Sequence, residues 1–373
     1  MNTSLFCKIT KYIYVIIIIT SINFSQQVLG QERSCNEKEK VCEWLKKVVA
    51  IKTPTMIASG IFLSDSIIVT NRHVVEDSKA VLVRMPNKKI IKAFTIPNNH
   101  TADIAFISLT KNIKSIKFDF DHSQPKKTRM IAFDIGRNDI RIFPETNIIS
   151  YPEPNKPQAR IHSSARNLPG SSGGALIDKN GNLIGIIASG GGEYNEAVPV
   201  HLLKDVYDQN NIENEKFFQT GKAIRLCADA LEEAQQYHNK PEKVLLRKIQ
   251  TNCELSNNKL LLDMAGQAFG RFGLINDSIY FLEKSTKLDP KSPTSLHSLA
   301  VALHLNKSYE KEIPILKTLL EFTPEDPQAL RLAVQAAAFS KNKDFGEYAI
   351  SLMEIHNPSA VPLARGFLDN AFD

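Results

Sequence analysis

The hydrophobic and polar positions of this chain follow two different periods, one on each side of residue 200. From about residue 47 to 200, apolar residues alternate with polar ones or form short runs, as at 48–51, 66–70 and 104–109. Turn-forming residues separate these runs, which is typical of short β-strands. With about eleven or twelve such runs and no helical pattern between them, the sequence predicts barrels or a sandwich.

One turn in this half has a specific signature. Residues 179–182 read Lys-Asn-Gly-Asn and lie between the apolar runs 175–178 and 183–189. Asn-Gly favours the tight turns that join antiparallel strands. We therefore expect a hairpin here.

The second half follows a helical period. Residues 200–207 predict a helix that closes the β part, residues 208–216 form a polar connection, and helical periodicity continues from Lys222 to the end. Within it the prolines at 290, 324 and 358 stand 34 residues apart. Registering the sequence on them aligns Leu262 with Leu296 and Leu330, Gly266 with Ala300 and Val334, and Leu282 with Leu316 and Ile350.

A fixed period of this kind predicts stacked pairs of antiparallel helices, with a generic helical bundle as the alternative. Over residues 259–373 the pattern resembles tetratricopeptide repeats, although their usual aromatic and alanine positions are mostly replaced. A divergent repeat is expected at 225–258, with Cys227 beginning its first helix and Cys253 ending its second. These two ends are neighbours in a helix pair, so a bridge between the two cysteines is geometrically reasonable.

The N-terminus predicts export. Lys8 and Lys11 precede the mostly apolar run 12–24, and no acidic residue occurs before Glu32. With a small residue at Gly30, this pattern indicates a signal peptide over 1–30, which leaves no stable membrane anchor once cleaved. The alternative is a transmembrane anchor, but a run of this length spans only about 20 Å of helix, less than the hydrocarbon core.

Four cysteines remain after such cleavage, namely Cys35, Cys42, Cys227 and Cys253. An even number in an exported chain favours disulfides, and three connectivities are possible; free thiols are the alternative. On one unbroken helix Cys35 and Cys42 would lie about 10.5 Å apart, too far to bridge, so pairing would require a bent loop. The spacings do not fit a metal site, and the sequence predicts no metal or other cofactor.

Three segments of the β half carry residues suited to nucleophilic chemistry. His73 directly follows one strand run, Asp103 precedes another, and Ser172 stands in a glycine-rich turn before a third. A serine hydroxyl needs a base to take its proton, an imidazole titrates in the right range, and a carboxylate orients that imidazole. The surrounding glycines allow a sharp turn that aims the amides of Gly170 and Ser172 at one point, as an oxyanion hole.

These segments, TNRHVV, ADIAFISL and GSSGGALID, resemble those of the trypsin/chymotrypsin-like serine proteases, closest to the Deg/HtrA branch. The resemblance covers about 45–210 and implies two six-stranded barrels with a cleft between them. It implies His73 as general base, Asp103 as its orienting partner, Ser172 as nucleophile, and proteins or peptides as substrates.

The chain departs from that family in two places. Ser171 stands where digestive trypsin-like enzymes have Asp, and a neutral serine cannot pair with a newly cut N-terminus. The oxyanion loop must therefore be held by other contacts. No PDZ-like pattern follows the protease part, because helical repeats occupy that position.

The specificity pocket is expected to involve Arg166, Ser189, Gly190 and Ala197. A guanidinium at Arg166 would favour an acidic residue before the scissile bond. The alternative is that Arg166 points elsewhere and a small aliphatic residue is preferred.

Composition and charge narrow the function classes. The chain has 373 residues, of which 43% are hydrophobic and 23% charged, and this excludes a wholly disordered protein. The net charge of +6 includes Lys8 and Lys11; residues 31–220 hold 26 Lys and Arg against 21 Asp and Glu, and residues 221–373 hold 18 against 19. No basic run resembles a nucleic-acid groove, so no nucleic-acid partner is expected.

The sequence thus predicts an all-β, trypsin-like double β-barrel followed by an all-α region of tetratricopeptide-like repeats. The expected division is a signal peptide over 1–30, a cysteine-containing segment over 31–44, a protease domain over 45–212 and repeats over 222–373. The predicted function is an exported serine endopeptidase whose repeats bind a protein partner or substrate. The alternatives are an inactive scaffold or binding protein, and an esterase that uses the same triad.

Overall fold

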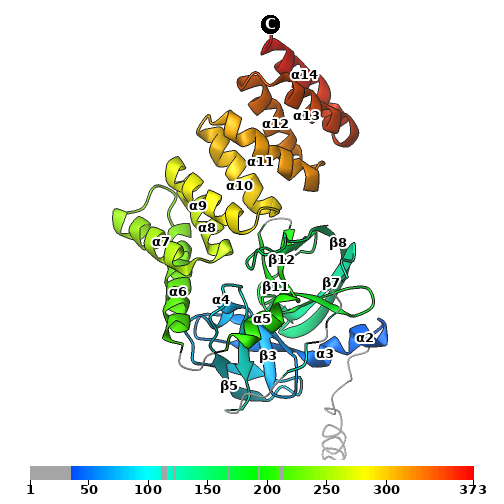
Figure 1. Ribbon diagram of the computed structural model, residues 1–373, viewed down its shortest axis with the longest axis vertical. Coiled ribbons are helices and arrows are strands. Elements are labelled where there is room, and N and C mark those ends of the chain that lie inside the picture. The colour runs from blue at the N-terminus through cyan, green and yellow to red at the C-terminus, as the bar shows by residue number, and fades with distance from the viewer. Residues whose placement is uncertain are drawn as a thin grey trace, which may run out of the picture. The chain divides into compact units, whose positions relative to one another are not determined.

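The first β-barrel begins where the chain turns from polar residues to the buried run at Val48. Its six antiparallel strands close in the order β1-β2-β3-β6-β5-β4. Strands β3 and β5 of this barrel are labelled in Figure 1. They are β1 (Val48–Lys52), β2 (Ile57–Phe62), β3 (Ile67–Thr70), β4 (Ala80–Arg84), β5 (Ile90–Ile96) and β6 (Ala105–Ser108). Short runs of β-branched residues with turn residues between them explain why these segments pair as strands.

The computed structural model describes residues 35–110, 116–118, 120, 123–166, 168–191, 194–210 and 214–373. The predicted signal peptide and Cys7 lie outside the described residues. Glu39–Asp373 form one compact unit by their contacts, and this unit contains both barrels and the helices that follow them.

The second barrel closes in the order β10-β11-β12-β9-β8-β7. Its strands are β7 (Lys127–Asp134), β8 (Asp139–Ser150), β9 (Ile161–Ser163), β10 (Ala175–Ile177), β11 (Leu183–Gly191) and β12 (Tyr194–Pro199). The separate apolar runs at 140–143 and 147–150 form the single strand β8. Strand β9 was not predicted, because it has only three residues, two of them polar. The expected hairpin is confirmed: β10 pairs with β11, and Gly181 donates its amide to Asp178.

An apolar core joins the two barrels. Ile61 and Val69 of the first barrel belong to the same buried cluster as Ile131 and Ile186 of the second. The short helix α5 (Leu202–Asp208) closes the β part as expected and adds Leu203 to this core. Further contact comes from the indole of Trp44, which donates a hydrogen bond of 3.0 Å to Gly181 O. The short helices α2 (Glu39–Cys42) and α3 (Trp44–Lys47) lead into β1.

Helices make up the remainder of the chain. They are α6 (Glu215–Gln235), α7 (Lys243–Ser256), α8 (Lys259–Arg271), α9 (Ile275–Leu288), α10 (Pro293–Leu305), α11 (Tyr309–Phe322), α12 (Pro327–Phe339), α13 (Lys343–His356) and α14 (Val361–Asn370), with the 3-10 helix η1 (Pro358–Ala360) before α14. The starts of α8, α10, α12 and α14 are 34 residues apart, and so are those of α9, α11 and α13. None of the helices within the described residues is long and apolar enough to cross a membrane.

The positions that the 34-residue register aligned are buried. Leu262, Leu296 and Leu330 are at most 2% exposed, and the set of Leu282, Leu316 and Ile350 at most 1%. At Gly266 a side chain is excluded, because a Cβ atom would lie 2.5 Å from Leu282. Close approach of paired helices therefore explains the small residue. The resemblance to tetratricopeptide repeats stays a prediction.

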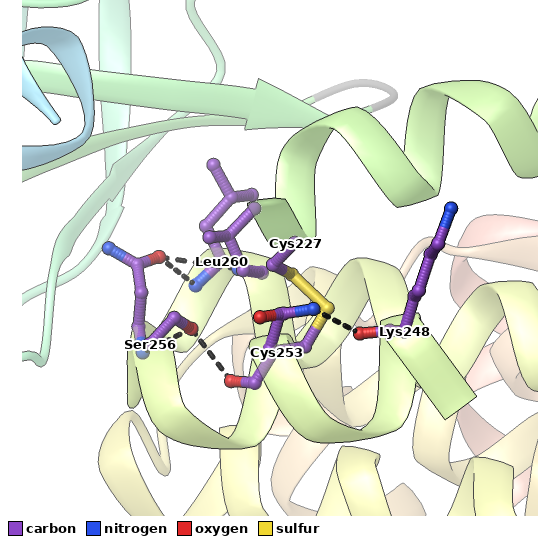
Figure 2. The surroundings of a disulfide bond; sticks show 8 residues. Cys227, Lys248, Cys253, Ser256 and Leu260 are labelled. Carbon is purple, nitrogen blue, oxygen red and sulfur yellow. Dashed lines mark hydrogen bonds between the residues drawn. A yellow bond between two sulfur atoms is a disulfide. The ribbon is translucent and has the colours of Figure 1, made fainter. Parts of the chain in front are cut away.

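A disulfide joins the first two of these long helices. Cys227 and Cys253 are bridged, with their Cα atoms 4.8 Å apart and both residues buried (Figure 2). The position differs from expectation in one respect, because α6 begins at Glu215 and Cys227 therefore lies in the middle of the helix. Cys42 also takes part in a disulfide.

Removing this bridge is expected to destabilise the helical region. Replacing both Cys227 and Cys253 by Ala should lower its free energy of unfolding by about 3 to 4 kcal/mol, because the bridge closes 26 residues of chain. Urea unfolding followed by circular dichroism measures the change. Equal midpoints for the variant and the oxidised wild type would contradict the expectation.

Candidate active site

His73 and Asp103 are held together by two hydrogen bonds. His73 lies in the short helix α4 (Arg72–Val75), directly after β3, and Asp103 directly precedes the strand β6 that pairs with β3. The His73 amide donates to Asp103 Oδ1 over 2.9 Å, and His73 Nδ1 lies 2.8 Å from Asp103 Oδ2. The carboxylate therefore fixes the ring and leaves Nε2 as the ring atom free for proton transfer.

Asp103 stays ionised despite its burial. Its side chain is 1% exposed and that of His73 is 14% exposed. Burial alone raises the pKa of Asp103, but the charge and hydrogen bonds of His73, together with the charge of Arg160, hold the pKa at about 2. Asp103 is thus a carboxylate across the physiological range, and it can stabilise a protonated His73.

Ser172 lies in a tight loop whose glycines have no room for a side chain. Gly170 and Gly173 have φ values of +95° and +85°, a region that favours glycine. A Cβ atom on Gly173 would lie 2.0 Å from Ser59 O and 2.3 Å from Thr70 Oγ1. The Ser172 loop therefore packs directly against β2 and against the end of β3, three residues before His73.

The loop presents two amides without a bonding partner. Among the described residues, neither the Gly170 nor the Ser172 amide donates a hydrogen bond, whereas the Gly173 amide donates to Ile187 O. The Ser172 hydroxyl donates to Ala188 O over 2.8 Å. No hydrogen bond joins it to His73 in the described structure, so a turn about its χ1 angle must precede any transfer of its proton to His73.

Ser59 of the first barrel holds this loop, and sequence reasoning missed it. Its hydroxyl donates to Gly170 O over 2.7 Å and accepts from the Phe133 amide, and its own amide donates to Ser172 O over 2.7 Å. Ser171 beside it is fully buried, and its hydroxyl has no partner among the described residues. The loop has Ser171 at the position where digestive trypsin-like enzymes have Asp, so other contacts must hold it. Ser59 supplies such contacts, and they are uncharged.

Replacing Ser59 by Ala is expected to lower kcat about 10- to 100-fold with little change in KM, because the loop amides lose their position. The variant also leaves Gly170 O and the Phe133 amide unpaired. Peptide hydrolysis measures the effect, and Ser66→Ala in the same barrel is the control. A kcat equal to that of the control would contradict the role of Ser59.

The residues expected at the specificity pocket lie on the second barrel. Arg166 is exposed in the segment after β9, Ser189 and Gly190 lie in β11, and Ala197 is buried in β12 opposite Ile187. The preference for an acidic residue before the scissile bond stays a prediction. A peptide library tests it, since no enrichment of Glu or Asp at that position would contradict it.

Two buried arginines flank the His73–Asp103 pair, and no sequence pattern predicted them. Arg72, next to His73, donates to Glu76 O and to Phe217 O of α6, and its guanidinium lies 3.6 Å from the Phe217 ring centre. Burial lowers the pKa of Arg72 to about 10. Arg160, just before β9, lies 3.2 Å from Asp103.

The structure thus combines two closed six-stranded barrels with an Asp-paired His after β3 and a glycine-bounded Ser before β10. Residues 58–186 match the family model described as trypsin-like peptidase domain. Over this stretch the chain is similar to trypsin-like peptidase domains, and its relatives include HtrA and DegP-like serine proteases.

Curated relatives match in the same half. The "Serine protease Do-like HtrA" of Lactobacillus helveticus is 30% identical over 128 residues, which are 32% of this chain and 31% of that protein. A "Probable periplasmic serine endoprotease DegP-like" of Pseudomonas fluorescens is 27% identical over 180 residues, or 41% of this chain and 34% of that protein. The chain thus spans about a third of the length of these relatives.

Solved structures match more distantly. The protease Rv3671c of M. tuberculosis H37Rv, a mutant in an inactive form, is 18% identical with a TM-score of 0.39, over 48% of this chain and 94% of that one. A serine protease of a human pathogenic astrovirus is 20% identical with a TM-score of 0.34, over 42% of this chain and 90% of that one.

Proposed function

We propose that this chain is an exported serine endopeptidase in which Ser172 is the nucleophile, His73 the general base and Asp103 its orienting partner. The observation that carries the proposal is the paired His73 and Asp103 beside a loop with two unpaired amides. An ionised, buried carboxylate on His73 Nδ1 supports a base, and the amides of Gly170 and Ser172 support an oxyanion hole.

In this mechanism the Ser172 hydroxyl turns from Ala188 O toward His73 Nε2. His73 takes the proton as Ser172 Oγ attacks the carbonyl carbon of the scissile peptide, and the Gly170 and Ser172 amides stabilise the oxyanion. His73 then gives the proton to the leaving amine, and an acyl-enzyme remains on Ser172. Water, which loses a proton to His73, then attacks the acyl carbon, and His73 returns the proton to Ser172 Oγ as the carboxylic acid product leaves.

A fluorophosphonate probe tests the nucleophile directly. We expect covalent labelling of the native protein, mapped by mass spectrometry to the peptide that contains Ser172, and loss of unfolded-casein cleavage in the labelled protein. An inactive scaffold would show neither labelling nor cleavage. Labelling without cleavage of casein, but with turnover of simple esters, would favour an acyl hydrolase of another kind.

Export is supported by the N-terminal pattern and by the Cys227–Cys253 bridge, since structural disulfides persist in oxidising compartments. The Pseudomonas fluorescens relative is named as a periplasmic protein. Secretion of the full chain, with Gln31 as the first residue of the mature protein, is the expected outcome. Edman or mass-spectrometric sequencing of the exported form measures it, and retention of residues 1–30 would contradict it.

Partner or substrate binding by the helical region is supported by a line of aromatic rings on successive repeats. Tyr309, Phe339 and Phe367 follow one another at centroid distances of 4.9 and 5.8 Å, and Phe339 is 52% exposed. Exposed aromatic side chains are enriched where proteins bind partners. Phe339→Asp is expected to weaken binding of unfolded casein, measured by fluorescence anisotropy, and Leu363→Asp on α14 is the control.

A further inference from the structure

Arg160 shares one carboxylate oxygen with His73. Its side chain is fully buried, and Nη2 lies 3.2 Å from Asp103 Oδ2, the oxygen that also contacts His73 Nδ1. The other guanidinium nitrogens, Nε and Nη1, have no hydrogen-bond partner among the described residues. A buried cation is costly unless it is paired, and the hydrogen-bonded ion pair with Asp103 offsets part of that cost.

Asp289, which follows α9, ties the strand that carries Arg160 to the helical region. Its Oδ2 accepts from the Arg160 amide over 3.2 Å and lies 2.9 Å from His162 Nε2. All three residues are fully buried. One carboxylate thus contacts both the Arg160 amide and the His162 ring, and it fixes the start of β9 to the helical region.

Further charged and polar contacts lie around Asp289. Lys259, the first residue of α8, pairs with Glu196 of β12 and donates to Ser292 Oγ over 2.9 Å. Its Nζ also lies 4.0 Å from Asp289 Oδ2. Gln158, two residues before Arg160, accepts from the Lys259 amide over 2.8 Å. The helices thus hold both the strand and the segment that leads into it.

We infer that Arg160 is a positioning residue for Asp103, and that the helical region holds it in place through Asp289, so that the triad is complete only with the helices docked on the second barrel. The inference rests on the proposed function, in which His73 is the base. Arg160 acts through Asp103: its hydrogen bond directs Oδ2, and its charge offsets part of the charge that Asp103 places on His73.

Loss of the Arg160 charge changes proton binding by His73 in a direction that can be predicted. A purely structural role for Arg160 predicts no such change. The charged groups near Asp103 are His73 and Arg72 from α4 and Arg160 from the start of β9, and Arg160 is faced by Glu196 and Asp289. Without the Arg160 charge, Asp103 attracts the His73 proton more strongly. The acid limb of the kcat/KM profile then moves to higher pH.

Two substitutions at position 160 separate charge from geometry. Arg160→Gln is expected to lower kcat about 10- to 100-fold, with KM little changed, and to move the acid limb to higher pH. Arg160→Lys keeps the charge, so its acid limb stays at the wild-type position even where kcat falls. An active Arg160→Gln enzyme with wild-type kcat and an unmoved acid limb would overturn the inference.

A double-mutant cycle tests whether Asp289 acts on the His73–Asp103 pair through Arg160. Asp289→Asn is expected to lower kcat in the wild-type background and to add little in the Arg160→Gln background, because both changes interrupt the same path. Ser150→Ala, which removes a 2.9 Å contact to Lys291 O at the same interface, is the matched control and should leave kcat unchanged. Additive losses of kcat for Asp289→Asn and Arg160→Gln would refute a connection through Arg160.

A proton NMR measurement separates this inference from the proposed function. In the Ser172→Ala protein, the low-field signal of the His73 Nδ1 proton bonded to Asp103 reports the pair without catalysis. We expect Arg160→Gln to shift this signal, whereas Ser150→Ala leaves it in place. An unshifted signal overturns the inference, and failure of fluorophosphonate labelling in wild type overturns the proposed function alone.

Discussion

The Ser172→Ala variant is expected to cleave unfolded casein about 10⁶-fold more slowly than the wild-type protein, while its circular dichroism spectrum stays the same. The hydroxyl is the group that forms the acyl-enzyme, and no other side chain in the loop replaces it. Loss of a triad serine typically removes nearly all triad catalysis and leaves only the oxyanion hole and binding. Casein cleavage under single-turnover conditions measures the loss.

The neighbouring Ser171 provides a matched control. Ser171 directly precedes Ser172 in the chain and is fully buried. Its hydroxyl has no partner among the described residues. Ser171→Ala should therefore retain activity close to wild type. Adding His73→Ala to Ser172→Ala should cost nothing further, because the two groups act as one unit. Full activity in Ser172→Ala, or equal loss in Ser171→Ala, would contradict the assignment of the nucleophile.

Replacing Lys259 by Met is expected to lower the free energy of unfolding by about 3 to 5 kcal/mol, because it leaves an uncompensated buried charge. Lys259 is 1% exposed and pairs with Glu196, which is 5% exposed, across the contact between α8 and β12. Burial raises the pKa of Glu196, but the charge of Lys259 above all holds the pKa at about 2. This stabilisation is present above the unfolded pKa, near 4.3, and is lost as pH falls toward 2.

An exposed pair of the same chemistry is the control for this prediction. Lys284 pairs with Glu254 in the helical region, with side chains 38% and 43% exposed. Lys284→Met should cost less than about 1 kcal/mol, as surface pairs do. Adding Glu196→Gln to Lys259→Met should restore part of the loss, since the uncompensated charge is then removed. Urea unfolding at pH 7 measures all four proteins, and equal losses for Lys259→Met and Lys284→Met would contradict the expectation.

These contacts give the helical region a structural role beside the partner binding that we propose. Lys259 and Asp289 from the helices meet Glu196, His162 and Arg160 from the second barrel in a buried, charged contact. Charges that are buried together must be desolvated together, so the contact forms as a unit or not at all. Any ligand that changes how the helices dock would therefore change the surroundings of Asp103.

Much of the fold follows from local patterns. Short alternating runs predicted the strands, because a strand with one buried face needs apolar residues at every second position. The 34-residue period predicted the helix starts and the buried positions 262, 296 and 330, because each repeat buries the same face against its neighbours. Strand β9 escaped prediction, since three residues carry no period and the partner of its buried His162, Asp289, lies far away in the sequence.

The sequence also paired His73 with Asp103, through the resemblance of their segments to those of trypsin-like serine proteases. Only the tertiary structure decided how that pair is held. Ser59, Arg160 and Asp289 contact the loop, the carboxylate and the strand from positions far apart in the chain. An isolated Ser, Arg or Asp gives no local signal of its partner, since its role depends on burial and distance, which arise when the barrels and helices pack together.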